Sequence, residues 1–318
     1  MKPTVVVTGS SGYIGGQTAL ALKDAGYTVV GVDIRPTPSH LTNALDHYCQ
    51  SDFSSPGAID FMFMHNPVAI IHCAGTSLVG PSVIDPELYY QNNFVRTKIL
   101  LDAIITNQKQ DIRIIFSSSA SVYGEPVMVP CSEGDPPLPM SPYGESKLMI
   151  EMMMQSYFRA YGLQPVMFRY FNACGADPQG RHGQEPGATH IVARVLENIR
   201  DNKTFTLNGT NFSTPDGTCI RDYIHVSDIA NAHVLAVESD VPTGVYNLAT
   251  MRGVSNQEVI STAEEITKQK VNVDIGHSRT GDPAVLTASD ERFNSVKPDW
   301  RQYSFEDMVA HAWKWYVR

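Results

Sequence analysis

The chain has 318 residues, of which 42% are hydrophobic and 18% charged, and its formal net charge at pH 7 is −9. This length provides for one large or two medium domains with a sizeable core. The negative charge argues against a nucleic-acid partner and against an acidic membrane surface, and no apolar run in the sequence approaches the length of a membrane span.

The five cysteines indicate reduced thiols rather than a disulfide framework. Their number is odd, they form no Cys-x-x-Cys pair and their spacings suit no zinc module, so no metal is expected. The first predicted strand begins by Thr4, which leaves no room for a signal peptide. We therefore expect a cytoplasmic protein.

The first 26 residues predict a strand, a glycine-rich turn and a helix. A β-branched run over Thr4–Val7 is typical of a buried parallel strand, and apolar residues at helical spacing follow over Ile14–Ala25. Glycines in such a turn let the backbone approach a pyrophosphate, while the helix N-terminus offers N–H donors. The spacing is Gly-x-x-Gly-x-x-Gly rather than the generic Gly-x-Gly-x-x-Gly, but the context predicts a dinucleotide site at Gly9, Gly12 and Gly15.

A second apolar strand over Thr28–Val32 ends at Asp33. A carboxylate at this place binds the adenosine ribose hydroxyls of NAD and repels the 2′-phosphate of NADP. Arg35 lies two residues further on, and an arginine there can serve NADP. The carboxylate favours NAD as the cofactor.

Strands and helices then alternate through the first half of the chain. Apolar runs predict strands at 68–73, 113–116 and 166–171, and helical spacing predicts helices at 88–105 and 143–161. This alternation predicts an α/β fold with a doubly wound, Rossmann-type parallel sheet, whose ligands lie at the carboxyl ends of the strands.

The pattern changes after Asn172, where a loop rich in Gly, Pro and Asp begins. Helices at 190–200, 255–269 and 305–316 and a strand at 204–207 predict a smaller, interleaved α/β lobe for the substrate. We assign 1–172, with about 222–250, to an NAD-binding domain, and 173–221 and 251–318 to a nucleotide-sugar-binding lobe.

Tyr143 and Lys147 share one face of a predicted helix, since residues at i and i+4 are neighbours there. A phenol has a pKa of about 10 and is a poor base at neutral pH, but a nearby cation favours the phenolate. The pair is therefore a candidate general base for an alcohol substrate. Ser119, the third residue of a triple serine at a predicted strand end, is suited to relay or orient the proton.

Long stretches of the chain resemble the extended short-chain dehydrogenase/reductase family and, within it, the NAD-dependent epimerases and dehydratases of nucleotide sugars. The resemblance covers nearly the whole chain and includes TGSSGYIG, IIHCAG, YYQNN, FSSSASVYG, SPYGESK, RYFNACGADP, DGTCIRDYIHVSDIANAH and GDPAVLTAS. It implies a catalytic triad of Ser119, Tyr143 and Lys147. The cofactor contacts that it implies are Gly9, Gly12, Tyr13, Ile14, Gly15, Asp33, Asp52, Phe53, Cys73, Ala74, Gly75, Asn92, Ser117, Tyr143, Lys147, Tyr170 and Phe171. The implied substrate contacts are Ser119, Tyr143, Asn172, His190, Ile191, Thr206, Asn208, Arg221, Arg279, Asp282 and Leu286.

The activity that the resemblance implies is interconversion of UDP-glucose and UDP-galactose. The sugar C4 is oxidised with NAD to a 4-keto intermediate, which is then reduced on its opposite face, so that no external redox partner is needed. A related dehydratase needs an acidic pair after the serine, where this chain has Ala120 and Ser121. A catalytically idle nucleotide-sugar-binding homologue is a further alternative, and the intact triad argues against it.

Four positions depart from the family pattern. Cys73 replaces a bulkier apolar residue, Ser77 a cofactor-contacting lysine, His190 an asparagine beside the diphosphate and Asn208 a frequent aromatic at the uracil. Leu286 occupies the position at which the family closes the pocket beside the sugar C2 group. Leucine is smaller than tyrosine, so we expect preference for simple UDP-hexoses and measurable activity on the N-acetylated pair.

The two predicted helices at 88–105 and 143–161 carry apolar residues on more than one face. The second helix contains Met149, Met152, Met153 and Met154, too many for one core-facing stripe. The resemblance implies that these helices pair with their copies in a four-helix bundle, which predicts a homodimer.

Overall fold

The computed structural model describes residues 3–238, 241–278 and 283–318. Its main layer is a parallel sheet, which confirms the predicted fold class. The strands follow the spatial order β10 (Gly244–Leu248), β6 (Pro165–Tyr170), β5 (Arg113–Ser119), β4 (Ala69–His72), β1 (Thr4–Thr8), β2 (Thr28–Asp33) and β3 (His47–Gln50). The order reverses between β1 and β4, the point at which ligands bind in such sheets.

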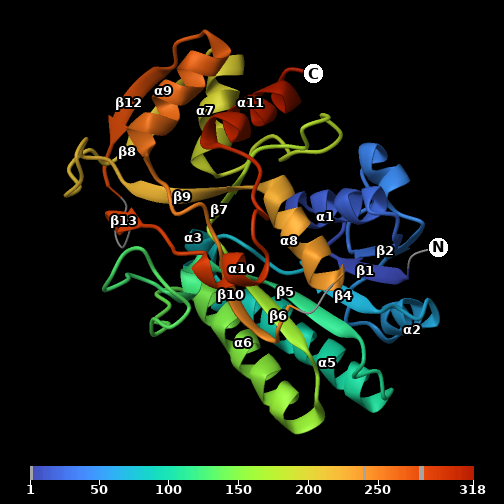
Figure 1. Ribbon diagram of the computed structural model, residues 1–318. Helices are drawn as coiled ribbons and strands as arrows, with labels where there is room; N and C mark the ends of the chain where they lie inside the picture. The colour runs from blue at the N-terminus through green and yellow to red at the C-terminus, as the bar shows by residue number, and fades with distance from the viewer. Residues whose placement is uncertain (1–2, 239–240, 279–282) are drawn as a thin grey trace.

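Helices cover both faces of this sheet (Figure 1). Alternate residues of β1 point to opposite faces, because side chains of a strand have a period of two. Val5 and Val7 pack with α1 (Tyr13–Asp24) and α8 (Val226–Glu238). Val6 packs on the other face, whose helices are α2 (Pro56–Met64), α5 (Arg96–Thr106) and α6 (Pro142–Tyr161).

The second lobe has its own small sheets and core. Strand β9 (Ile220–His225) pairs with β11 (Gly253–Ser255), β13 (Val285–Leu286) and β7 (Asn172–Cys174), and β8 (Thr204–Asn208) pairs with β12 (Asn272–Gly276). The helices α7 (Ile191–Arg200), α9 (Asn256–Thr267) and α11 (Phe305–Tyr316) enclose its core. Strand β9 pairs with strands of this lobe, and α8, which follows it directly, packs against the large sheet.

Shorter elements connect these layers. They are η1 (Ser39–Ala44), α3 (Val79–Ile84), α4 (Pro86–Tyr89), η2 (Tyr90–Val95), η3 (Ala120–Val122) and α10 (Glu291–Val296). Among the described residues, no helix has both the length and the apolar character needed to cross a membrane.

The predicted helix over 88–105 is not a regular α-helix, which corrects the sequence analysis. A π-helical turn, η2, separates α4 from α5. Neighbouring residues of an α-helix diverge by about 100°, and the wider π turn relaxes this constraint. Asn92 and Asn93 therefore both reach Thr76: Asn92 donates to its hydroxyl (2.8 Å), and Asn93 accepts from its N–H (2.7 Å).

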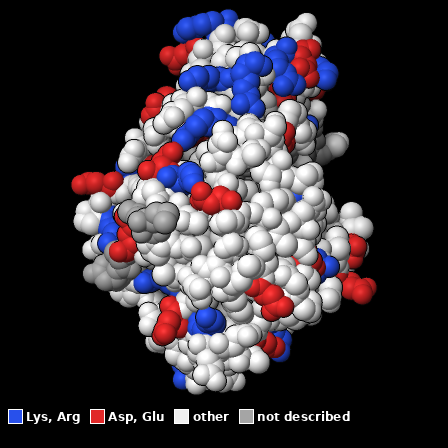
Figure 2. All heavy atoms as spheres, turned by 90° about the vertical axis from the view of Figure 1, so that its right-hand side faces the viewer, with Lys and Arg blue, Asp and Glu red and all other residues white. Residues whose placement is uncertain are grey.

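Charged side chains are unevenly distributed on the surface. Figure 2 shows lysines and arginines gathered at the upper end of one face, over the second lobe. Ion pairs in this lobe join Asp201 to Arg200 (2.7 Å) and to Lys203 (3.0 Å). Part of the positive charge of the lobe is therefore neutralised locally.

Candidate active site

The glycine-rich turn between β1 and α1 packs tightly against the loop after β4. Gly9 has φ +74°, and a Cβ built there would lie 2.7 Å from the backbone nitrogen of Ala74. A Cβ on Gly15 would lie 2.1 Å from the carbonyl oxygen of Gly9. Gly12 is the N-cap of α1 and has no side chain to occupy the helix N-terminus. The turn thus leaves backbone donors at a helix end, an arrangement that fits a dinucleotide pyrophosphate.

Asp33 lies at the end of β2 beside this turn. Its side chain is buried and accepts hydrogen bonds from the backbone nitrogens of Ser11 (3.0 Å) and Arg35 (2.9 Å). The Arg35 guanidinium extends into solvent with its Nε 3.6 Å from the carboxylate. Arg35 Nη2 also reaches the turn, 3.4 Å from a Cβ built on Gly12. The carboxylate is held at the turn by the two backbone donors, which fits the ribose hydroxyls of NAD.

Asp52 and Phe53 follow the end of β3. The Asp52 carboxylate pairs with Arg96 Nε of α5 at 3.0 Å. The Phe53 ring is buried against His72, with the ring centroids 4.7 Å apart. Both predicted cofactor residues therefore lie at the carboxyl edge of the sheet, on the same side as Asp33.

A row of polar side chains crosses the ends of β4, β5 and β6. Ser117 Oγ lies 3.1 Å from Cys73 Sγ and 2.9 Å from the Tyr170 hydroxyl. The Tyr170 hydroxyl is also 2.6 Å from His233 Nε2, and burial lowers the pKa of this histidine to about 3. His233 is therefore neutral and fixes the tyrosine. Sequence reasoning missed His233, whose only signal was a polar residue on the buried face of α8.

The remaining predicted cofactor residues surround this row. Tyr13 donates from its hydroxyl to the carbonyl of Gly175 (2.6 Å) and so ties the glycine turn to the second lobe. Burial raises the pKa of Tyr13. Ile14 packs against the core on the α1 face, and Phe171 is buried in a cluster below the triple serine. Gly75 follows Ala74, and a Cβ there would lie 2.9 Å from Asn93 Oδ1.

The three predicted catalytic residues meet where β5 ends and α6 begins. Ser119 is the last residue of β5, and Tyr143 and Lys147 lie in the first two turns of α6. Lys147 Nζ donates to the carbonyl of Ser117 (2.8 Å) and lies 5.8 Å from the centre of the Tyr143 ring. Ser119 Oγ accepts from the backbone N–H of Ser121 (3.1 Å).

The electrostatics of the triad differ from the sequence expectation. Burial raises the pKa of Tyr143, and a hydrogen bond with Ser119 opposes this effect. Burial lowers the pKa of Lys147 to about 8, although the nearby Cys73 and Glu151 act to raise it. Desolvation penalises each charged form, and for Tyr143 it outweighs the opposing effect of Ser119. In the protein alone, the tyrosine is therefore a neutral phenol at pH 7.

A cavity of about 220 Å³ lies in the second lobe. It brings together six of the residues predicted to bind substrate: Asn172, His190, Ile191, Thr206, Asn208 and Arg221. Asn172 Nδ2 donates to the carbonyl of Asp222 (2.8 Å), which connects β7 to β9. Burial lowers the pKa of His190, so its imidazole is neutral.

Sequence reasoning missed several residues of this cavity: Thr189, Arg194, Phe205, Leu207, Cys219, Tyr223 and Asn256. Arg194 lies one helical turn after His190 on α7, and that i+4 spacing could have revealed it. Its guanidinium lies 5.7 Å from the centre of the Phe205 ring. The cavity thus combines two arginines with an aromatic ring, a composition suited to a nucleoside diphosphate.

Leu286 is the register neighbour of a residue that lines the cavity. On β13 it is paired in register with Arg221, and it packs against a cluster that includes Phe171 and Ala120. Arg279 and Asp282, also predicted to bind substrate, lie outside the described residues.

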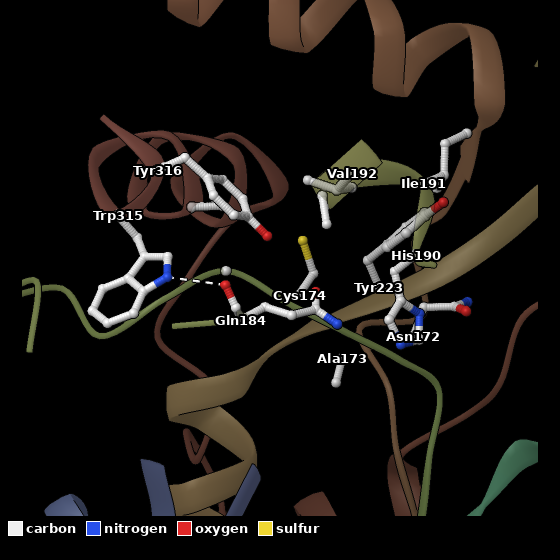
Figure 3. Close-up of a pocket in the computed structure, with 13 residues that line it drawn as sticks. Asn172, Ala173, Cys174, Gln184, His190, Ile191, Val192, Tyr223, Trp315 and Tyr316 are labelled. Atoms are coloured by element: carbon white, nitrogen blue, oxygen red, sulfur yellow. Dashed lines mark hydrogen bonds between the residues drawn. The ribbon is translucent and has the colours of Figure 1, made fainter. Parts of the chain in front are cut away.

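A smaller cavity of about 30 Å³ adjoins the first and shares Asn172, His190, Ile191 and Tyr223 with it (Figure 3). The hydroxyl of Tyr316, from α11, points toward Cys174 in this space. The volume accommodates about one water molecule. This cavity is therefore part of the floor of the larger one.

Comparison with known proteins gives consistent matches over nearly the whole chain. The model of the NAD-dependent epimerase/dehydratase family matches residues 5–249. The UDP-glucose 4-epimerase of Halalkalibacterium halodurans is 40% identical over 320 residues, which cover 98% of this chain and 95% of that protein. The structure of UDP-glucose 4-epimerase from Brucella ovis in complex with NAD is 37% identical, with a TM-score of 0.90 and 97% and 96% of the two chains covered.

The structure of UDP-glucose 4-epimerase from Bifidobacterium longum in complex with NAD+ and UDP is 31% identical, with a TM-score of 0.89. The similarity covers 98% of this chain and 97% of that chain. With the family model and the near-full-length relative, these matches show that the chain belongs to the NAD-dependent epimerase/dehydratase family.

Proposed function

We propose that this protein interconverts UDP-glucose and UDP-galactose. The observation that carries the proposal is the grouping of Ser119, Tyr143 and Lys147 where β5 ends and α6 begins. The same molecule has a glycine turn at the carboxyl edge of the sheet and a cavity lined by two arginines in the second lobe. Relatives similar over nearly the whole chain are UDP-glucose 4-epimerases, which supports the same reaction here.

The residues at the carboxyl edge of the sheet fit NAD as the cofactor. Gly9, Gly12 and Gly15 would hold the pyrophosphate and Asp33 the adenosine ribose, while Lys147 would contact the second ribose. When bound, NAD supplies a hydride acceptor and donor at the sugar carbon, and its positive ring favours the phenolate of Tyr143.

The protein residues move the proton and hold the substrate. Tyr143 takes the proton from the sugar hydroxyl, and Ser119, whose hydroxyl acts on the phenol, would relay that proton. Lys147, held by the Ser117 carbonyl, supplies a fixed positive charge beneath the phenol. Arg194 and Arg221 line the cavity and would pair with the diphosphate, because guanidinium groups match phosphate oxygens. Arg279 and Asp282 remain proposed contacts.

Two alternatives are less well supported. A dehydratase needs carboxylates beside the serine, but Ala120 is apolar and Ser121 contacts Ser119 through its hydroxyl (3.2 Å). An idle binding protein does not require the close grouping of all three triad residues. For the sugar range, Leu286 supports preference for simple hexoses with measurable activity on the N-acetylated pair.

We also propose a homodimer. The division into an NAD-binding domain and a nucleotide-sugar-binding lobe is likewise a proposal. Apolar residues of the α4–α6 region remain exposed, namely Leu88, Val95, Ile99, Met149, Met152, Phe158 and Tyr161. Helices α5 and α6 lie side by side at one end of the molecule, where a second copy could cover them (Figure 1).

We also propose the cytoplasm as the location of the protein, which the five free cysteines support.

The direct test is to incubate the purified protein with UDP-galactose, without added NAD, and to identify the products. We expect UDP-glucose to form until the two sugars reach equilibrium, since the hydride returns within the site. Unchanged UDP-galactose, with and without added NAD, would refute the proposed function.

A further inference from the structure

The inner face of α6 meets the three consecutive serines of β5 with three of its own residues. The Ser119 hydroxyl acts on the Tyr143 phenol and opposes the rise of its pKa on burial, and Lys147 donates to the carbonyl of Ser117. Glu151, one turn beyond Lys147, accepts a hydrogen bond from the hydroxyl of Ser118. The spacing of i, i+4 and i+8 therefore fastens the helix to the strand along two turns.

Glu151 is also one half of a buried ion pair. Its two carboxylate oxygens accept from Arg169 Nε (3.0 Å) and Nη2 (2.6 Å), and the side chains are 1% and 5% exposed. Arg169 lies on β6 directly beside Ser118. The carboxylate thus joins α6 to two neighbouring strands at once.

The far side of Arg169 is held as well. Its guanidinium carbon lies 4.7 Å from the centre of the Tyr123 ring, and the Tyr123 hydroxyl donates to Asn247 Oδ1 (2.7 Å). These contacts leave the guanidinium little freedom to move. The position of the Glu151 carboxylate is therefore determined by the sheet rather than by the helix alone.

A buried ion pair of this kind contributes little net stability, because desolvation of both ions offsets their attraction. What it does provide is a defined geometry, and here the geometry is the separation between the catalytic helix and the serine strand. We propose that Glu151 is a positioning residue for the catalytic triad, and that Arg169 holds its carboxylate in place. This inference rests on the proposed function.

The carboxylate also acts on Lys147 through its charge. The titratable groups that face the ammonium are Glu151 and Tyr143 from α6, and Cys73 and His72 from the end of β4. Among the described residues of β5, the contacts of the Lys147 ammonium are the Phe116 ring (4.8 Å) and the carbonyl of Ser117. Glu151 is the carboxylate of this set and favours the charged lysine.

Two substitutions separate the reach of Glu151 from its charge. Glu151→Asp keeps the charge but is one methylene shorter, so we expect kcat to fall at least about 10-fold with KM changed less than about twofold, as misplaced catalytic groups give. Glu151→Gln keeps the reach but loses the charge. We expect it to lower kcat and to shift the titration midpoint of Lys147 downward by at least ~0.5 pH unit.

The midpoint is measured by NMR on the NAD-loaded protein with ¹³Cε-labelled lysine, using Lys147→Arg to assign the signal. Ser118→Ala removes one contact of Glu151 without leaving a buried charge unpaired, and should lower kcat by a few fold even if Glu151→Gln folds poorly.

Asp290→Asn is the matched control, because Asp290 is a buried carboxylate paired with Arg301 (2.8 Å). It should lower stability but leave kcat and the Lys147 midpoint unchanged.

The inference fails if Glu151→Asp keeps kcat within about twofold of the wild type, or if Glu151→Gln leaves the Lys147 midpoint in place. It also fails if Asp290→Asn reproduces both effects. Absence of epimerase activity in the wild type would instead refute the proposed function. The NMR titration needs no substrate, so the effect of Glu151 on Lys147 is tested in either case.

Discussion

Lys147 Nζ donates a 2.8 Å hydrogen bond to the backbone carbonyl of Ser117, two residues before the catalytic candidate Ser119. A backbone acceptor cannot be lost by substitution of the serine side chain. The ammonium is consequently tied to the same strand that ends at the catalytic serine, and its place relative to Tyr143 depends on how α6 packs on β5.

Tyr143→Phe should remove the proposed general base with little disturbance of packing, since only the hydroxyl is lost. We expect kcat for UDP-galactose to fall at least about 100-fold, the usual scale for such a group. Far-ultraviolet circular dichroism and NAD content should remain as in the wild type. Near-wild-type turnover in this variant would contradict the mechanism.

The nucleotide released on denaturation should be NAD or NADH, because the Asp33 carboxylate faces the glycine turn. Gly9→Ala should reduce the amount retained, since its Cβ would lie 2.7 Å from the Ala74 nitrogen. Gly57→Ala is the control, because among the described residues no atom lies within 4 Å of a Cβ built there. Mainly NADP in the released fraction would show that Arg35 decides the cofactor.

Leu286→Tyr should raise the preference for simple hexoses over N-acetylated ones. The ring would fill space beside Arg221, the register partner of Leu286, and exclusion by bulk typically changes relative rates about 10- to 200-fold. The ratio of kcat/KM for UDP-galactose and UDP-N-acetylgalactosamine measures this. An unchanged ratio would mean that Leu286 does not contact the sugar.

Met152→Glu should convert a dimer to a monomer. The Met152 side chain is 60% exposed on α6, and a carboxylate there would be buried without a partner in a helix bundle. Light scattering should give twice the chain mass of 35.0 kDa for the wild type and a single chain mass for the variant. Met64→Glu, on α2 where Met64 is 68% exposed, should remain dimeric. A monomeric wild type at micromolar concentration would refute the bundle.

Stability should fall as the pH is lowered from about 6.5 to 4. Burial lowers the pKa of His182 to about 4, so in this window the unfolded chain binds a proton that the folded protein does not. The stabilisation from the neutral histidine is complete above pH 6.5 and amounts to roughly 3 kcal/mol by this argument. The pKa of His72 and His225 is lowered to about 3 in the same way and adds to the effect.

Urea unfolding at several pH values measures this dependence. The slope of the unfolding free energy against pH is proportional to the number of protons taken up on unfolding. His182→Gln should lower that number by up to one, whatever it does to stability at pH 8. An unchanged slope would show that His182 binds protons equally in the folded and the unfolded chain.

Local patterns in the sequence were sufficient for much of this molecule. The Gly9 turn was predictable because a strand, three glycines and a helix follow one another directly. The pairing of Tyr143 with Lys147 was predictable because helical spacing alone places them on one face. The alternation of strands and helices likewise predicted the parallel sheet, whose carboxyl edge collects the ends of its strands.

Tertiary packing decided the rest, because it depends on residues far apart in the chain. The Glu151 carboxylate reaches Ser118 and Arg169 only after α6, β5 and β6 have assembled. No residue spacing in the sequence predicts these two contacts. The protonation of Tyr143 was decided in the same way. An adjacent lysine predicted a lowered pKa, but burial of the phenol raises it, since desolvation depends on the whole fold rather than on one neighbour.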